Sequence, residues 1–405
     1  MRVLVITSLF PNATDPRSSP FNRQQFAALR SLCDVEVWAT IPWHPGRSRR
    51  TRRIPAEEWI DGLRVWHPRT PYVPGTGHAF SVPLFVAALA PAMRRRRRDF
   101  DVVLGSWAYP DGAAAVALGQ LAGLPAAIKL HGSDINVMAT MRVGRFALEK
   151  ALPAADAVIA VSRPLAEQAR KLGASKQRIH LVRNGVDRGR FCLRDRGAAR
   201  RQLGLDDRAR WILYCGHLKR SKGIEDLLDA FSSIARQRPD VRLAVVGDGR
   251  VRRRCESLAA ELGGRILVAG SRPHDEIPAW LAACDVLALP SWSEGTPNVV
   301  LEALACGRRV VATDVGGTAD LLPSKTLGEV VAAHSPVELG AALSRALASP
   351  YDPRDVAREA DVVGWDESAA ALHDALASAV AGSDGSGPSA FGRDGAAISE
   401  VRRHG

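Results

Sequence analysis

Two glutamates with seven residues between them are the side chains of this sequence best suited to chemistry. Glu294 lies in a polar loop after the apolar run DVLAL, and Glu302 falls in the second turn of a helix that we expect to begin at Pro297. Carboxylates accept hydrogen bonds from paired sugar hydroxyls. The pair therefore predicts a site for a ligand that carries such hydroxyls, although two glutamates alone could share this spacing by chance.

The backbone around the two glutamates is suited to a phosphate group. The first N–H groups of the expected helix, those of Asn298 and Val299 among them, lack partners within the helix and attract anions. Gly295 and Thr296 lie in the same loop, and the glycine pair 316–317 follows the next strand, where a backbone without Cβ can approach a ligand closely. Two carboxylates beside an anion-binding helix end match the anatomy of a nucleotide-sugar, whose diphosphate joins two sugars.

A second group of candidate residues follows the apolar run WILYC. A strand, then Gly216, then basic residues before an amphipathic helix form an arrangement typical of phosphate binding, with Lys222 as a point charge. His217 directly follows the glycine, and Arg220 is a further source of positive charge. The alternative is a helix preceded by solvated lysines.

His131 is the candidate residue of the first half of the chain. It follows the apolar run AAIKL, so we expect it at the carboxyl end of a strand, where ligands bind in open parallel sheets. A lone histidine is more often structural than functional. Asp134 is a weaker candidate because it could equally cap the helix that follows.

Apolar runs that alternate with helical patterns supply the elements that must position these residues. The runs are VLVIT, DVEVWA, DVVLGS, AAIKL and AVIAVS, then WILYCG, RLAVVG, RILVAG, DVLALP and RVVAT. Most are continuously apolar, which is typical of parallel strands covered on both faces. Two such series predict an α/β protein with two doubly wound domains.

The charge of the chain limits its partners. Its 405 residues carry 55 Lys and Arg against 43 Asp and Glu, a formal net charge of +12. The excess favours an anionic membrane surface, nucleic acid or a phosphorylated substrate, unless it is only an arginine-rich solvated surface. We expect no specific nucleic acid, because no aromatic-interleaved binding motif accompanies the arginines.

Cysteine usage and apolar runs indicate the compartment. Six scattered cysteines without metal-ligand spacing predict buried reduced thiols and a cytoplasmic chain. The N-terminus has too short an apolar run for a signal peptide. The longest apolar run, which starts at Val82, contains prolines and is about half a membrane span.

An expected helix over residues 81–99 is apolar at its start and ends in the arginine run Arg94–Arg98. This run is either a solvated face or part of a surface that binds the inner face of the cell membrane peripherally. In the second interpretation four apolar side chains lie in the lipid interface: Phe80, Leu84, Phe85 and Leu89.

These motifs resemble the retaining glycosyltransferases of family 4, whose hallmark is two glutamates with seven residues between them. The elements SEGTPNVVLEALACG and LHGSDIN are further similar to the teichuronic-acid-biosynthesis type. The resemblance covers roughly residues 1–380. The chain departs from the family at Pro20, where relatives often have glycine, at His217, where arginine is usual, and at Arg309, where proline is usual.

The resemblance implies the GT-B fold, two Rossmann-like doubly wound parallel-sheet domains that face a cleft. It implies transfer of a hexose from a nucleotide-diphosphate sugar to a hydroxyl acceptor, including a lipid-linked one. Glu302 would hold the ribose and Glu294 the transferred sugar, which His131 would also contact. Lys222, with His217 or Arg220, would neutralise the leaving diphosphate. The assigned donor-binding residues also include Gly216, Gly295, Thr296, Asn298 and Val299.

The resemblance further implies a reaction without a metal or cofactor. Asp99-Phe100-Asp101 has the DxD form of metal-dependent glycosyltransferases of the other main fold, but it lies between an arginine-rich helix end and a strand start. We therefore assign it no metal.

Five segments follow from this interpretation. They are an acceptor-side domain (1–185), an arginine-rich linker (186–207), a nucleotide-sugar domain (208–362), a helix that returns to the first domain (363–380) and a disordered tail (381–405). Two rival functions are a nucleotide-sugar epimerase or hydrolase on the same scaffold and a non-enzymatic protein that binds anions or nucleic acid.

Overall fold

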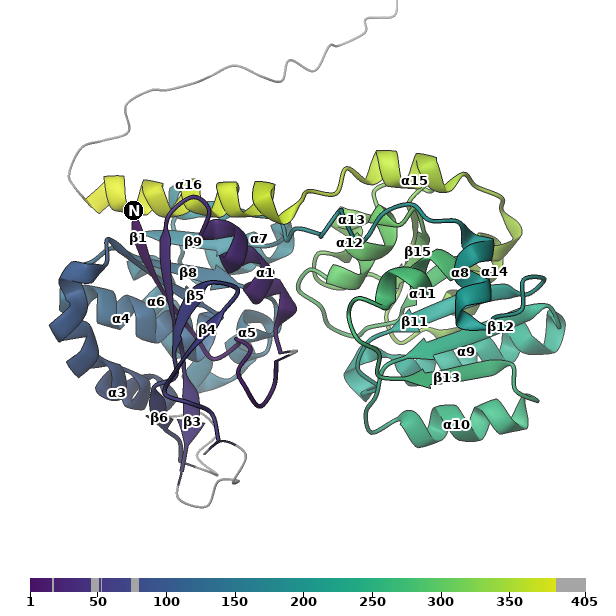
Figure 1. Ribbon diagram of the computed structural model, residues 1–405, viewed down its shortest axis with the longest axis horizontal. Coiled ribbons are helices and arrows are strands. Elements are labelled where there is room, and N and C mark those ends of the chain that lie inside the picture. The colour runs from purple at the N-terminus through teal and green to yellow at the C-terminus, as the bar shows by residue number, and fades with distance from the viewer. Residues whose placement is uncertain (17, 45–50, 52, 74–79, 384–405) are drawn as a thin grey trace, which may run out of the picture.

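The computed structural model of the protein describes residues 1–383, with gaps at 17, 45–50, 52 and 74–79 (Figure 1). Within these residues the chain forms two large β-sheets with helices packed on them, side by side in Figure 1. The described residues end at 383, so the rest of the tail predicted from residue 381 lies outside them.

The first sheet has the strand order β10-β9-β8-β7-β1-β2-β5-β4. Its strands are β1 (Arg2–Thr7), β2 (Asp34–Ala39), β4 (Glu57–Ile60), β5 (Leu63–Trp66), β7 (Val102–Ser106), β8 (Ala126–Leu130), β9 (Ala157–Ala160) and β10 (Ile179–Leu181). Neighbours are parallel except at the edge, where β4 is antiparallel to β5. A small parallel pair, β3 (Ile41–Trp43) and β6 (Arg69–Pro71), lies apart from it.

The second sheet is parallel throughout its described strands, in the order β13-β12-β11-β14-β15-β16. They are β11 (Arg210–Cys215), β12 (Val241–Val246), β13 (Ile266–Gly270), β14 (Val286–Leu289), β15 (Arg309–Thr313) and β16 (Gly328–Val331). All ten predicted strands are present in the two sheets. Their continuous apolar character is explained by helices on both faces, which leave β7, β8, β9 and β14 buried at every position.

Helices cover both faces of each sheet. On the first sheet, α1 (Pro20–Leu29) and α16 (Trp365–Ser383) share one core, and α3 (Ser81–Arg96), α4 (Ala113–Ala122) and α6 (Arg142–Ala154) contribute to those on the other side. On the second sheet, α9 (Ile224–Gln237), α10 (Arg252–Glu261) and α14 (Pro336–Ala348) share one core, and α11 (Ile277–Ala283) and α12 (Asn298–Ala305) share the other. Shorter or connecting helices are α5 (Ser133–Asn136), α7 (Arg163–Lys171), α8 (Arg196–Leu203), α13 (Thr318–Leu321) and α15 (Pro353–Ala360).

The arginine-rich segment after the first sheet packs on the second sheet's side. It contains α8, which lies against α11. The Arg200 guanidinium is buried there, 2.8 Å from the Asp285 carboxylate, and also donates to the Ala283 carbonyl. A buried charge requires such pairing, so this segment is firmly attached to the second sheet.

The last helix returns to the first sheet, as Figure 1 shows along its upper side. Leu372 and Leu376 of α16 are fully buried with Val3 and Phe26 in one core. The chain thus passes between the two sheets twice, and the two crossings run together: the Val186 N–H donates to the Val363 carbonyl over 3.0 Å. A Cβ on Gly185 would lie 2.6 Å from the Trp365 backbone, so the crossings are in tight contact.

The structure corrects the lipid-facing surface predicted on α3. Phe85 and Leu89 point into the core and are 5% and 0% exposed. Arg96 is bound to the Glu36 carboxylate rather than free for headgroups. The predicted helix is present, but two of its four predicted lipid-facing side chains serve the fold.

The carboxylates of the DxD sequence are held by arginines. Asp99 contacts Arg96 at 2.9 Å and Asp101 contacts Arg2 at 2.6 Å.

Within the described part of the chain, no helix combines the length and apolarity that a membrane crossing needs.

The six cysteines are free thiols. Cys255, Cys284 and Cys306 are buried as predicted, and burial raises the pKa of Cys255 to about 11. The other three cysteines are only partly buried.

Replacing a buried leucine of α16 tests whether this helix anchors the first sheet. Leu376→Ala should leave a cavity and lower the free energy of unfolding by about 2–5 kcal/mol, measured by denaturant titration. Asp374→Ala is the matched control, because that side chain is 85% exposed, and should change it by less than about 0.5 kcal/mol. Equal losses from the two variants would contradict the anchoring role.

Candidate functional site

The loops at the carboxyl ends of both sheets meet around a cavity of about 510 Å³. Loops after β11 and β14 form its wall on the second sheet's side, and the loop after β8 forms part of the opposite wall. Nine of the eleven predicted site residues line this cavity. They are His131, Gly216, His217, Lys222, Glu294, Gly295, Thr296, Asn298 and Val299. The structure therefore brings these distant segments together at one cavity.

The Lys222 ammonium and the Glu294 carboxylate are in direct contact in this cavity. Their Nζ and Oε1 atoms are 2.6 Å apart, and the Ser291 hydroxyl donates to the same oxygen over 2.6 Å. Both side chains are largely shielded, with 26% and 10% exposed. Shielding strengthens the attraction between the charges, so the pair holds both groups at the cavity wall.

Arg220 does not join this pair. Its guanidinium is 76% exposed, binds Glu225 at 3.0 Å and lies over the Trp292 ring. The sequence offered Arg220 and His217 as alternative sources of charge beside Lys222. Of these two, only His217 lines the cavity.

Gly295 lies where the two halves of the chain approach most closely at the cavity. A Cβ at this position would be 1.6 Å from the His131 carbonyl oxygen, so any side chain would force the loops apart. Beside it, the Thr296 hydroxyl donates to the Val161 carbonyl of the first half over 2.9 Å. These two residues, predicted from the sequence as ligand contacts, also hold the two halves together.

His131 is enclosed by aromatic side chains at the end of β8. Its ring centroid is 5.1 Å from that of Phe21 and 5.8 Å from that of Trp107. Its Nε2 atom is 2.9 Å from the Ser106 hydroxyl. Loss of hydration and the nearby Lys129 hold the pKa of His131 well below 6.5, so the ring is neutral near pH 7.

Asp134 positions this loop instead of capping the helix. Its carboxylate accepts N–H groups from Ala108 at 2.7 Å, Gly132 at 2.6 Å and His131 at 3.1 Å. These bonds join the residues after β7 to the residues after β8. Asp134 therefore fixes the backbone from which His131 and Trp107 extend.

Lys129 lies on β8, two residues before His131. Lys129 is fully buried, and burial lowers its pKa to about 7. Its ammonium donates to the Gln25 amide oxygen of α1, and the amide nitrogen of Gln25 donates to Ser368 of α16 over 2.9 Å. The strand that carries His131 is thus tied through α1 to the returning helix.

His274, which contacts Glu302, lines a second, larger cavity of about 1070 Å³. The His274 Nε2 atom is 2.8 Å from a Glu302 oxygen, and the ring packs on Phe191 with centroids 5.2 Å apart. His274 is missing from the site residues predicted from the sequence. The signal was its place in the loop after a strand, at the same edge of the sheet.

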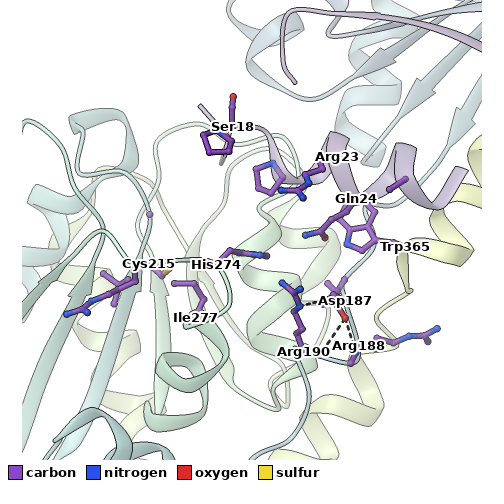
Figure 2. Close-up of a pocket in the computed structure, with 18 of the residues that line it drawn as sticks. Ser18, Arg23, Gln24, Asp187, Arg188, Arg190, Cys215, His274, Ile277 and Trp365 are labelled. Carbon is purple, nitrogen blue, oxygen red and sulfur yellow. Dashed lines mark hydrogen bonds and ion pairs between the residues drawn. The ribbon is translucent and has the colours of Figure 1, made fainter. Parts of the chain in front are cut away.

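Figure 2 shows the larger cavity between α1 and the second sheet. Arg23 and Gln24 extend from α1, Cys215 from β11 and Ile277 from the start of α11. Asp187 and Arg190 come from the segment that crosses between the sheets after Gly185. Pro16 and Ser18 of the loop after β1, and Pro20 at the start of α1, also line this cavity. The two cavities share Cys215, Gly216 and His217, so they adjoin.

Asn184 adds a further link across the cleft. Its side-chain amide donates to the Asn298 side-chain oxygen over 2.8 Å, which joins the crossing segment to the first residue of α12. Asn184 also lines the smaller cavity.

Two family models match the larger part of the chain. Residues 24–190 match the model described as Glycosyltransferase Family 4, and residues 209–349 match the model described as Glycosyl transferases group 1. The first match ends and the second begins in the crossing segment between the sheets.

Individual proteins agree with these matches. The chain is 32% identical over 333 residues, 79% of its length and 83% of the relative's, to TuaC of Bacillus subtilis (strain 168), named as a glycosyltransferase of teichuronic acid biosynthesis. It is similar in structure to sucrose-phosphate synthase from Thermosynechococcus elongatus, with TM-score 0.69, 22% identity and 95% and 98% of the chains covered. It is also similar in structure to Anabaena HepE in complex with UDP, with TM-score 0.65 and 20% identity, and the match covers 93% of this chain and 96% of HepE. At these identities the structural likenesses indicate the fold alone, and they confirm the predicted GT-B fold.

The pH dependence of stability tests the contact between His274 and Glu302. The hydrogen bond to Glu302 raises the pKa of His274 above its ordinary 6.5. The contact therefore stabilises the fold fully below that ordinary value and loses this contribution as the pH rises through the raised pKa. His274→Gln should lower Tm most below about pH 6.5 and should approach the parent at alkaline pH, measured by scanning fluorimetry.

The variant Glu302→Gln provides the control for this experiment. In its background the additional His274→Gln change should have the same effect at every pH, because the carboxylate that raises the pKa is gone. A pH-independent effect of His274→Gln in the parent would contradict the assignment.

Proposed function

The chain belongs to glycosyltransferase family 4, and from that premise we propose that it transfers a hexosyl group from a nucleoside-diphosphate sugar to an acceptor hydroxyl with retention of anomeric configuration. The observation that carries the proposal is the contact between Lys222 and Glu294 in a cavity that His131 faces from the other side. A cation for the leaving group and a carboxylate for the sugar are thus in direct contact at one cavity wall.

We place the diphosphate of the donor beside Lys222 and the start of α12. The N–H groups of Asn298 and Val299, both at the cavity wall, have no partners within the helix and favour an anion. Lys222 would stabilise the negative charge that grows on the diphosphate as the glycosidic bond breaks. This arrangement assigns the lysine a transition-state role in addition to binding.

We assign the two glutamates to different sugars of the donor. Glu294, in the smaller cavity, would accept hydroxyls of the transferred hexose and orient it below His131. Glu302 would accept the ribose hydroxyls beside the larger cavity, where His274 holds its carboxylate. Because the HepE complex contains UDP, uridine diphosphate is the first nucleotide to test.

We propose that the reaction needs no metal cofactor. Lys222 supplies positive charge at the position of the diphosphate, and each glutamate of the site is already paired with a cationic or basic side chain. Turnover should therefore persist after chelation with EDTA.

The acceptor would bind against the first sheet's wall of the smaller cavity. Phe21 and Trp107 both lie next to His131 there and offer apolar faces to a sugar ring. The likeness to TuaC supports a polysaccharide or another glycan as the acceptor. Its hydroxyl would enter between these rings.

Calorimetry with nucleoside diphosphates, followed by turnover with the matching sugars, tests the donor assignments. A hydrogen bond to a charged group contributes about 1.5–3 kcal/mol, so Glu302→Ala should weaken both the nucleoside diphosphate and its sugar roughly 10- to 150-fold. Glu294→Ala should spare nucleoside-diphosphate binding and lower turnover. Lys222→Ala should weaken both ligands.

Arg220→Ala is the matched control for Lys222→Ala, because Arg220 is a nearby cation that points away from the cavity. It should leave affinity and turnover within about twofold. Failure of every nucleoside diphosphate to bind the parent, or indistinguishable glutamate variants, would refute these roles. Donor consumption without an acceptor, or conversion to another sugar, would favour the hydrolase or epimerase alternative.

A further inference from the structure

Four large apolar side chains are exposed within one stretch of ten residues, and the first of them lines the smaller cavity. Val137 is 46% exposed, Met141 37%, Val143 40% and Phe146 64%. Exposed apolar residues that occur singly need no explanation, but several so close together in the chain point to an interaction surface. We call this group, together with its flanking basic residues, the α6 surface.

The exposure of Phe146 follows from the helical periodicity of α6. Its inward side is formed by Leu148, Ala151 and Leu152, which are buried in the core of the first sheet. At about 100° per residue Phe146 lies opposite these side chains, at the centre of the solvent-facing side. No packing requirement within the described structure explains an aromatic ring in that place.

Basic side chains surround the ring. Arg142, Arg145 and Lys150 are exposed on α6, and the Lys150 ammonium lies 5.8 Å from the centre of the Phe146 ring. One acidic side chain of the helix, Glu149, pairs with Arg145 at 2.8 Å. An apolar centre with a cationic border matches an interface between lipid chains and anionic headgroups.

The α6 surface is continuous with the candidate site. Val137 lines the smaller cavity together with Ser133, and both follow His131 in the loop and short helix after β8. The helix α6 begins five residues later, at Arg142. A molecule that rests on this surface therefore has direct access to the acceptor side of the cavity.

The arginine run of α3 lies elsewhere. It ends the helix directly before β7, and therefore lies near the amino ends of the parallel strands. The cavity lies at the carboxyl ends of the same strands. A surface at the arginine run would hold the site away from a bilayer, whereas the α6 surface would hold the site against it.

We propose that the α6 surface docks on an anionic lipid bilayer. The side chains of Phe146, Val143 and Met141 enter the interface, and Arg142, Arg145 and Lys150 contact the headgroups. A stable protein partner usually buries about 800 Å² on each side, more than one helical turn and its preceding loop present. A bilayer, in contrast, accepts a few inserted side chains and the charges around them.

This docking deepens the proposed function, on which its consequence for the acceptor rests. A bilayer at Val137 brings lipid-linked acceptors to the wall formed by Phe21 and Trp107. The docking itself depends only on the exposed side chains. Its failure is therefore distinguishable from failure of the transferase assignment, because donor binding is measured without lipid.

Co-sedimentation with vesicles tests the docking. The full chain should bind vesicles made of equal parts phosphatidylglycerol and phosphatidylcholine, and bind pure phosphatidylcholine far more weakly. Each basic residue near an anionic surface contributes about fivefold in affinity, so the triple variant Arg142→Gln/Arg145→Gln/Lys150→Gln should lose roughly 100-fold. Val143→Ser/Phe146→Ser should lose at least about tenfold.

Two controls remove the same features from other places. Arg94→Gln/Arg95→Gln/Arg97→Gln deletes three exposed charges from the arginine run, and Trp59→Ser deletes an aromatic ring that is 73% exposed on β4. Both should keep most of the vesicle affinity. All variants should keep the parent's Tm and nucleoside-diphosphate affinity, because the changed side chains are exposed and lie outside the donor site.

Three results would overturn the proposal. They are absence of binding by the parent to anionic vesicles, unchanged binding in the α6 variants, and a loss in the arginine-run variant as large as in the α6 variant. The last result would assign the docking to α3 or to net charge alone.

Discussion

The backbone approach at Gly295 is the constraint on which the candidate site depends. The His131 carbonyl and the Gly295 backbone are so close that a single methyl group between them would separate the two halves of the chain. This contact, with the bond from the Thr296 hydroxyl to Val161, sets the width of the cavity and places Glu294 opposite His131. The side chains that could do chemistry come from two sheets with separate cores, and this contact helps to bring them to one cavity.

Each glutamate of the site already has a partner that a ligand must share or replace. Lys222 holds Glu294, and His274 holds Glu302. Such pairs keep the carboxylates in position before a ligand arrives, which lowers the entropy cost of binding. They also reduce the net gain from each new hydrogen bond, because an existing one is exchanged. A site of this kind favours orientation over tight binding.

The sequence predicted what depends on local pattern. All ten predicted strands are present, because buried parallel strands are continuously apolar, and the spacing of Glu294 and Glu302 identified the loop and helix that carry them. Strands such as β10 (IHL) and β16 (GEVV) were not predicted because a polar residue or a glycine interrupts these short segments, which leaves no continuous apolar run. The face of α3 was predicted wrongly, since Phe85 and Leu89 look alike in sequence whether they meet lipid or a core. Roles such as those of His274 and Asp134 depend on partners 28 and 26 residues away, which no local pattern reveals.

The paired crossings between the sheets limit how the two halves can move. The segment before α8 and the segment before α16 are bonded to each other at Val186 and Val363. They therefore act as one connection made of two chain segments, which we call the strap. Because the two crossings are joined at one place, the strap can bend there, and bending about an axis that lies across the strap opens the cleft. Any opening of the cleft is then a swing about residues 185–186 and 363–365. Because its amplitude grows with distance from that axis, the loops farthest from the strap travel the most.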